Sequence, residues 1–125
     1  MSDKHEIKKG SVGISPRSHE MLISLVFEDS LSEYTNDRPF TSIVEAFRFA
    51  FSLGYVNGRK ETKSGKHVTV APRQFVVDEY LHLIRNEVLE NNTSLGGLIS
   101  EYAEGGCNII QERLSKDGNI LSLLE

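Results

Sequence analysis

A run of basic side chains in the middle of the chain offers the clearest opportunity for binding chemistry. Residues 58–73 contain five cations and a single acid, so this segment carries a net charge of +4 in a chain whose total is −4. Lysine and arginine bind phosphates without selecting a base sequence, and an acidic body repels an anionic partner elsewhere. The pattern predicts a DNA-backbone contact here, and the alternative is a loop that is charged only to stay solvated. The five cations are Arg59, Lys60, Lys63, Lys66 and Arg73.

The other reactive residue types lack the spacing of a catalytic or metal site. No two of the four histidines are separated as in a helical metal site, and Cys107 has no second cysteine to help it. Acids rather than bases lie near Cys107 in the sequence, so we interpret it as a buried structural residue. The glycines match neither phosphate-binding loop pattern. We therefore expect no catalytic residues, no metal, no cofactor and no enzymatic activity.

Length and composition indicate one globular domain. The 125 residues are 38% hydrophobic and 26% charged, as in ordinary globular proteins. No apolar run approaches the roughly 20 residues that span a bilayer, and the polar start lacks the apolar stretch of a secretory signal. A lone cysteine cannot form an internal disulfide, which fits a reducing compartment. We expect a cytoplasmic protein that makes no membrane contact.

Charge and turn signals separate an arm from the body. Residues 1–13 alternate charges and contain two glycines, so we predict a flexible N-terminal arm and a single helical domain over residues 14–125. Ser15-Pro16 marks the expected start of the first helix, because a capping hydroxyl precedes a proline. We expect this helix to fade near residues 29–30 and a polar loop to follow it.

The second helix should begin at Thr41 or Ser42, with Glu45 completing a capping box. Its end is left open by the sequence, since Gly54 could cap it or the helix could continue to Gly58. A connector follows, in which residues 67–71 alternate enough to form a short strand or an extended stalk.

Two more helices complete the expected fold. The third should run from Pro72 to residues 91–92, and the fourth should begin at Thr93 and stop at Asp117-Gly118. We expect Gly105-Gly106 to interrupt the fourth helix, since each glycine costs about 1 kcal/mol relative to alanine. The fold class is therefore mostly α: a compact four-helix domain with a short extended or β-hairpin-like basic connector between the second and third helices.

Excess apolar surface predicts self-association. The second helix has an unusually broad apolar face, and the tail after Gly118 is too apolar for a free end. We expect the tail to pack on the body or on another copy of the chain, and we predict a homo-oligomer. The residues expected at that interface are Phe47, Phe51, Leu121 and Leu124.

Two blocks of sequence resemble one family. The segments TSIVEAFRFAFSLGYVNGRK and ISEYAEGGCNIIQERL are similar to an aromatic helix with a Gly-Arg exit, and to a tyrosine-alanine-x-Gly-Gly segment, in DNA phosphorothioation-associated protein 4. The resemblance spans about residues 41–114. It implies a small accessory protein of bacterial DNA phosphorothioation-dependent restriction, which works with other proteins of that defence system. It implies no catalytic residues.

Two function classes follow. The first is a non-enzymatic accessory protein that docks on partners and touches DNA through the basic connector. The alternative is a DNA-binding transcriptional regulator of the ribbon-helix-helix type, with a strand at residues 11–15 and helices at residues 16–29 and 41–55. The strand signal for this alternative is weak, because residues 11–14 offer no basic side chains for reading bases.

Overall fold

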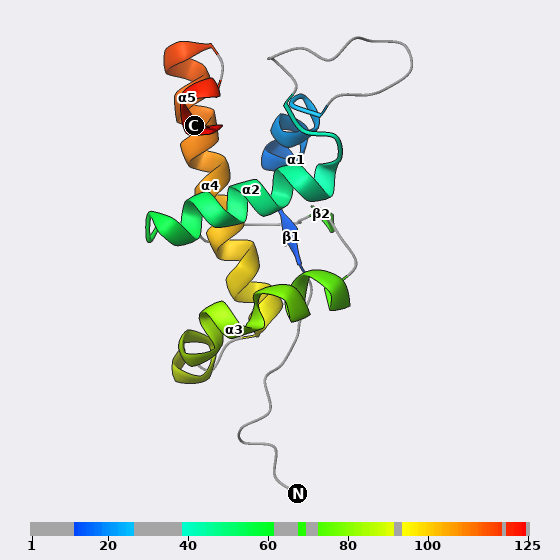
Figure 1. Ribbon diagram of the computed structural model, residues 1–125, viewed down its shortest axis with the longest axis vertical. Coiled ribbons are helices and arrows are strands. Elements are labelled where there is room, and N and C mark those ends of the chain that lie inside the picture. The colour runs from blue at the N-terminus through cyan, green and yellow to red at the C-terminus, as the bar shows by residue number, and fades with distance from the viewer. Residues whose placement is uncertain are drawn as a thin grey trace, which may run out of the picture.

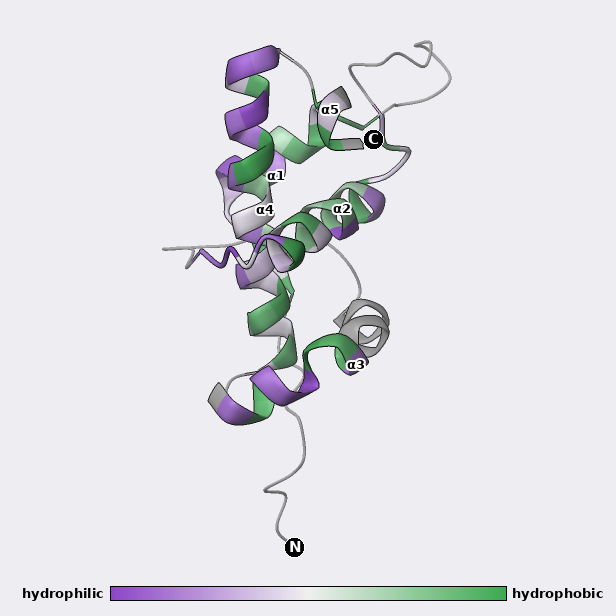
Figure 2. Cartoon of the chain, turned by 60° about the vertical axis from the view of Figure 1, so that its left-hand side comes forward, coloured by the Kyte–Doolittle hydropathy of each residue, from purple (hydrophilic) through white to green (hydrophobic). Residues whose placement is uncertain are grey.

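The protein is seen in a computed structural model of residues 1–125, which describes residues 12–26, 39–61, 68–69, 73–91, 94–118 and 120–124. As predicted, the chain is mostly helical, and Figure 1 shows a long α4 crossed by α2. Figure 2 shows hydrophobic residues in the N-terminal part of α4 and hydrophilic ones toward its C-terminal end. The described elements are β1 (Gly13–Ile14), α1 (Pro16–Ile23), α2 (Ile43–Val56), β2 (Val68–Thr69), α3 (Arg73–Asn91), α4 (Leu95–Asp117) and α5 (Leu121–Leu124).

Helix α4 is continuous, so the predicted interruption at Gly105-Gly106 is wrong. The Ser94 hydroxyl caps its start by accepting from the Gly97 N–H, and Gly118 ends it with φ 80°. The two glycines are tolerated inside the helix because other backbone lies against them. A Cβ atom at Gly105 would overlap the carbonyl oxygen of Arg59, and one at Gly106 would overlap that of Ala50.

Helix α2 begins as predicted and takes the longer of its two expected courses. The Ser42 hydroxyl accepts from the Glu45 N–H at 3.1 Å, and the Glu45 carboxylate accepts from the Thr41 N–H at 2.6 Å. The helix passes through Gly54, where a Cβ would overlap the Tyr102 carbonyl oxygen. It ends at Val56, and the chain then turns at Gly58 with φ 63°.

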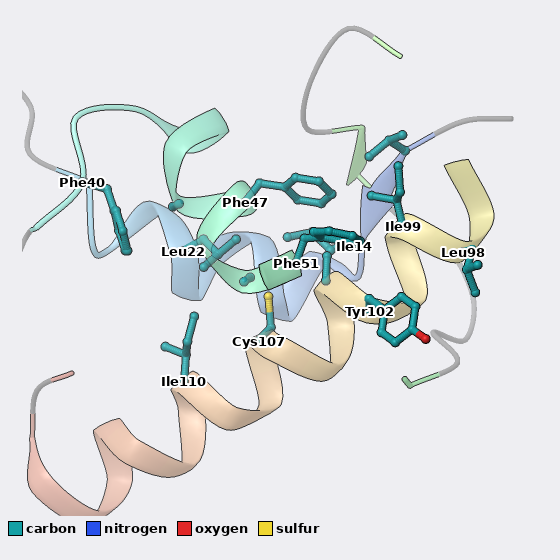
Figure 3. Close-up of a cluster of buried hydrophobic side chains, with 14 of the residues drawn as sticks. Ile14, Leu22, Phe40, Phe47, Phe51, Leu98, Ile99, Tyr102, Cys107 and Ile110 are labelled. Carbon is teal, nitrogen blue, oxygen red and sulfur yellow. The ribbon is translucent and has the colours of Figure 1, made fainter. Parts of the chain in front are cut away.

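The aromatic face of α2 is used inside the chain itself. Phe47 and Phe51 are 0% and 1% exposed, and Figure 3 shows them in the buried cluster with Ile14 and Tyr102. Neither ring is offered to a partner in this fold, so the interface role predicted for them has no support from their placement. The broad apolar face is instead explained by contact with α4, which covers α2 more than any other element does.

The predicted first helix is too long. Helix α1 ends at Ile23, because the chain extends beyond it to reach Phe40. Val26 forms a parallel β-bridge with Phe40, and the Phe40 N–H donates to the Leu25 carbonyl at 3.2 Å. Leu25 and Phe40 are both buried in the core, so burial outweighs the helical periodicity at this point.

The body of the protein begins earlier than residue 14. Val12 is fully buried, and Gly13 pairs with Thr69 in an antiparallel ladder between β1 and β2. The Gly13 N–H also donates to the buried Ser100 hydroxyl at 2.9 Å. These contacts place residues 12–13 in the domain rather than in the arm, and the rest of the predicted arm lies outside the described residues.

Helix α3 ends near the predicted position but is not straight. Ile84 has φ −125° and ψ 17°, so α3 consists of two helical pieces joined at a kink. The kink lets Ile84 and Val88 reach the core, while Leu83 and Leu89 stay 43% and 37% exposed. Over residues 81–90, the apolar side chains of α3 are therefore divided between the core and the surface.

The tail packs on the body, the first of its two predicted courses. Ile120 is 1% exposed, and Leu123 is half-buried against the same core. The side chains of Leu121 and Leu124 lie outside the described part of the structure, so their predicted interface role stays a prediction. Among the described residues, no helix is both long and apolar enough to cross a membrane.

A stability test follows from the contact of α2 with α4. Alanine favours helices over glycine by about 1 kcal/mol, yet we expect Gly106→Ala to lower the free energy of unfolding by about 2 kcal/mol. The new Cβ would force α4 away from the Ala50 carbonyl. Urea denaturation measures the change.

Ser115→Ala is the matched control, because Ser115 lies exposed on the same helix. We expect that substitution to change stability by less than about 0.5 kcal/mol. A Gly106→Ala variant as stable as the control would show that the two helices do not need this close approach.

Candidate nucleic-acid interface at the end of α2

The structure places two of the five predicted DNA-contacting cations in full. Arg59 and Lys60 follow directly after α2, and Arg73 is the first residue of α3, though its side chain is not described. Lys63 and Lys66 lie outside the described residues. The geometry of the candidate interface is therefore the geometry around Arg59 and Lys60.

The backbone at Arg59 is fixed against α4. Its N–H donates to the Gly54 carbonyl at 2.8 Å, and its own carbonyl lies against Gly105. Two residues on, the Glu61 N–H donates to the Glu101 carbonyl at 3.1 Å. Residues 59–61 thus run along α4, and both charged side chains start from a defined position.

Two carboxylates hold the Arg59 guanidinium. Its Nη1 and Nη2 donate to the two oxygens of Glu112 at 3.2 and 2.9 Å, and its Nε donates to Glu61 at 3.2 Å. The hydrogen bonds to Glu112, more than any other cause, raise the pKa of Arg59, and Arg59 in turn lowers the pKa of Glu112. The Arg59 side chain is 34% exposed and that of Glu112 is 63% exposed, so this pair sits in water.

Lys60 is built into the structure more firmly. Its Nζ lies 2.7 Å from one Glu87 oxygen and 5.7 Å from the centre of the Tyr102 ring. The Tyr102 hydroxyl donates to the other Glu87 oxygen at 2.6 Å. Burial raises the pKa of Glu87. The hydrogen bonds from Lys60 and Tyr102 together lower it by more, so the net shift of the Glu87 pKa is downward. Lys60 therefore links the end of α2 to α3 and α4.

The two cations differ in what they can do. Exposed ion pairs stabilise proteins by about 0–1 kcal/mol, so the Arg59–Glu112 pair can be exchanged for another anion at little cost. Moving the Lys60 ammonium to another anion would break its ion pair with Glu87, whose side chain is less exposed than that of Glu112. The Lys60 side chain is slightly more exposed than that of Arg59, at 39% against 34%, but the carboxylate paired with Arg59 is the one that is more easily displaced.

A hollow beside this cluster was not predicted. It has a volume of about 530 Å³ and opens at the kink of α3, where the Tyr55 hydroxyl donates to the Leu83 carbonyl at 3.1 Å. No sequence signal predicted this hollow, because the kink at Ile84 has no proline or glycine to mark it. Its lining combines Tyr55, His82, Leu83, Ile84, Arg85, Asn86, Glu87 and Glu90.

A buried carboxylate near the start of α1 has a structural role. Glu104 is 7% exposed and accepts from the Ser15 N–H at 2.9 Å and from the Ser18 hydroxyl at 2.6 Å. Through these bonds it fastens the start of α1 to α4. The sequence signal for this contact was the Ser15 cap alone.

Cys107 lies one turn further along α4, on the buried side. It is 1% exposed, and Figure 3 shows it within the hydrophobic cluster. Burial, with a smaller effect from Glu104, raises the pKa of its thiol to about 12. The interpretation of Cys107 as a buried residue is confirmed. Within the described part of the chain, no group of three or more His, Cys, Asp or Glu could hold a metal ion.

No protein-family model matches this sequence. Neither a curated protein nor a solved structure matches it. The resemblance to the phosphorothioation-associated family thus stays a prediction.

The bond between Tyr102 and Glu87 can be tested by stability. We expect Tyr102→Phe to lower the free energy of unfolding by about 1–2 kcal/mol, because it removes a hydrogen bond to a partly buried carboxylate. Tyr55→Phe is the matched control, since its hydroxyl bond to Leu83 is exposed and should contribute less. Equal effects in thermal or urea unfolding would contradict this assignment.

The state of Cys107 predicts its reactivity. With a pKa of about 12, the thiol is almost wholly protonated at pH 8, and the fold also shields it. We expect iodoacetamide to leave Cys107 unmodified in the native protein. The same reagent should alkylate Cys107 fully once the protein is unfolded in concentrated guanidinium chloride. Fast alkylation of the native protein, read by mass spectrometry, would contradict the buried assignment.

Proposed function

We propose that the chain is a non-enzymatic accessory protein that contacts the DNA backbone through its basic segment. One observation carries the proposal: Arg59 offers a partly exposed guanidinium from a backbone position fixed against α4, with an exchangeable carboxylate as its outer partner. The family resemblance extends the proposal to a bacterial DNA phosphorothioation-dependent restriction system and to partner proteins within it.

The chemistry of the guanidinium supports this choice of ligand. Its two terminal nitrogens form a planar fork that matches the oxygens of a phosphate as well as those of a carboxylate. Lys63, Lys66 and Arg73 follow within fourteen residues of Arg59 in the sequence and add charge to the same segment. A contact with a few phosphates gives sequence-independent binding that weakens steeply with salt.

The geometry favours this function over the ribbon-helix-helix alternative. Val12 and Ile14, in the segment proposed to read bases, are fully buried. Strand β1 also pairs with β2 of the same chain. Side chains that support the core cannot at the same time contact base edges, so the accessory role is the better supported one.

The test is a titration of a fluorescent 30-base-pair duplex (about three helical turns), unmodified and phosphorothioated, at low and at physiological salt. We expect binding at low salt, a several-fold loss of affinity in Arg59→Ala, and a salt slope reduced by about 1. The double variant Lys63→Ala/Lys66→Ala should bind the duplex more weakly than Arg59→Ala does, because it removes two cations. Arg17→Ala is the control, because it removes one exposed arginine on α1, outside the basic segment.

Four outcomes separate the parts of this proposal. Binding unchanged in both basic-segment variants would contradict the DNA contact, as would no binding at low salt. Tighter binding to the phosphorothioated duplex would support the family resemblance. Equal binding to both duplexes would keep the DNA contact and remove that support.

A further inference from the structure

The outer partner of Arg59 occupies the place that a phosphate would take. Both oxygens of Glu112 accept from the two terminal nitrogens of the guanidinium, at 3.2 and 2.9 Å. This is the bidentate arrangement that arginine also forms with a phosphate group. Glu112 comes from α4, 53 residues away in the sequence, so the fold rather than the local chain brings it here.

We propose that Glu112 is a built-in competitor that occupies the phosphate-binding fork of Arg59 and weakens DNA binding until a DNA phosphate displaces it. The inference rests on the proposed function, since it concerns the same arginine. It goes further by naming the group that regulates the contact and the step by which the contact forms.

Exchange at this fork requires little rearrangement. The Arg59 backbone is fixed by Gly54 and Gly105, and the guanidinium keeps its Nε bond to Glu61 when Glu112 leaves. Glu112 is 63% exposed and can return to water. Lys116 lies four residues further along α4, on the same face, and a glutamate followed by a lysine at this spacing is a favourable helical pair.

The neighbouring lysine does not share this property. Lys60 and Glu87 are joined by the Tyr102 hydroxyl as well, and the Glu87 side chain is only 28% exposed. Displacing Glu87 would break a cluster that holds three helices together. The competitor role is therefore assigned to Glu112 alone.

The experiment compares two variants that each remove one acid from α4 beside one arginine. Glu112→Gln removes the carboxylate at the terminal nitrogens of Arg59, whose Nε keeps its bond to Glu61. Asp117→Asn removes the carboxylate that lies 3.0 Å from Arg113 in the natural protein. We expect Glu112→Gln to bind the unmodified duplex about 3- to 5-fold more tightly than the natural sequence at low salt, and Asp117→Asn less than about 1.5-fold. Melting curves should show both variants folded, since both acids are on the surface.

The double variant Arg59→Ala/Glu112→Gln makes the test specific. Once Arg59 is absent, removal of Glu112 should raise affinity no more than Asp117→Asn does. Equal gains in Glu112→Gln and Asp117→Asn, with Arg59→Ala still weaker than the natural sequence, would overturn the competitor role and keep the DNA contact. No loss of binding in Arg59→Ala would also overturn the competitor role, and no loss in Lys63→Ala/Lys66→Ala beside it would overturn the proposed function itself.

Discussion

The close crossing of α2 and α4 holds the core together and sets the path of the chain that leaves α2. Gly54 on α2 meets the Tyr102 carbonyl, and Gly106 on α4 meets the Ala50 carbonyl, so each helix places a glycine against the other's backbone. Side chains at these two positions would hold the axes apart and open the core around Phe47 and Phe51. The crossing therefore depends on residues that contribute no side-chain contact of their own.

The same crossing delivers the charged residues to their partners. Because Gly105 has no side chain, the Arg59 carbonyl can lie directly against α4. The chain therefore leaves α2 along the surface of α4 and not into solvent. Arg59 then meets Glu112, and Lys60 meets Glu87 and Tyr102. The ion pairs therefore depend on the packing, because the glycines set the course of residues 59–60 along α4. The Lys60–Glu87 pair then connects this segment to α3.

Capping signals in the sequence predicted helix ends better than helix courses, although the end of α1 at Ile23 was missed. The caps at Ser15 and Ser42 and the stop at Gly118 depend on neighbouring residues, and all three occur as expected. The continuity of α4 and the kink at Ile84 depend on segments far along the chain, and both were missed. For the same reason the charge of the basic segment was evident, whereas the acids that hold Arg59 and Lys60, 53 and 27 residues away, were not.

The pairing of these two cations changes the electrostatic argument for binding. A free arginine in an otherwise acidic chain attracts any anion within about a Debye length, roughly 8–10 Å at physiological salt. An arginine that already holds a carboxylate attracts anions weakly from a distance but still forms a strong bidentate contact at short range. Under the proposed function, a phosphate must therefore be brought to Arg59 by the other cations of the segment, or by a partner protein, before it can replace Glu112. Arg59 would therefore bind a phosphate of DNA that is already docked on the protein more readily than it would capture an anion from solution.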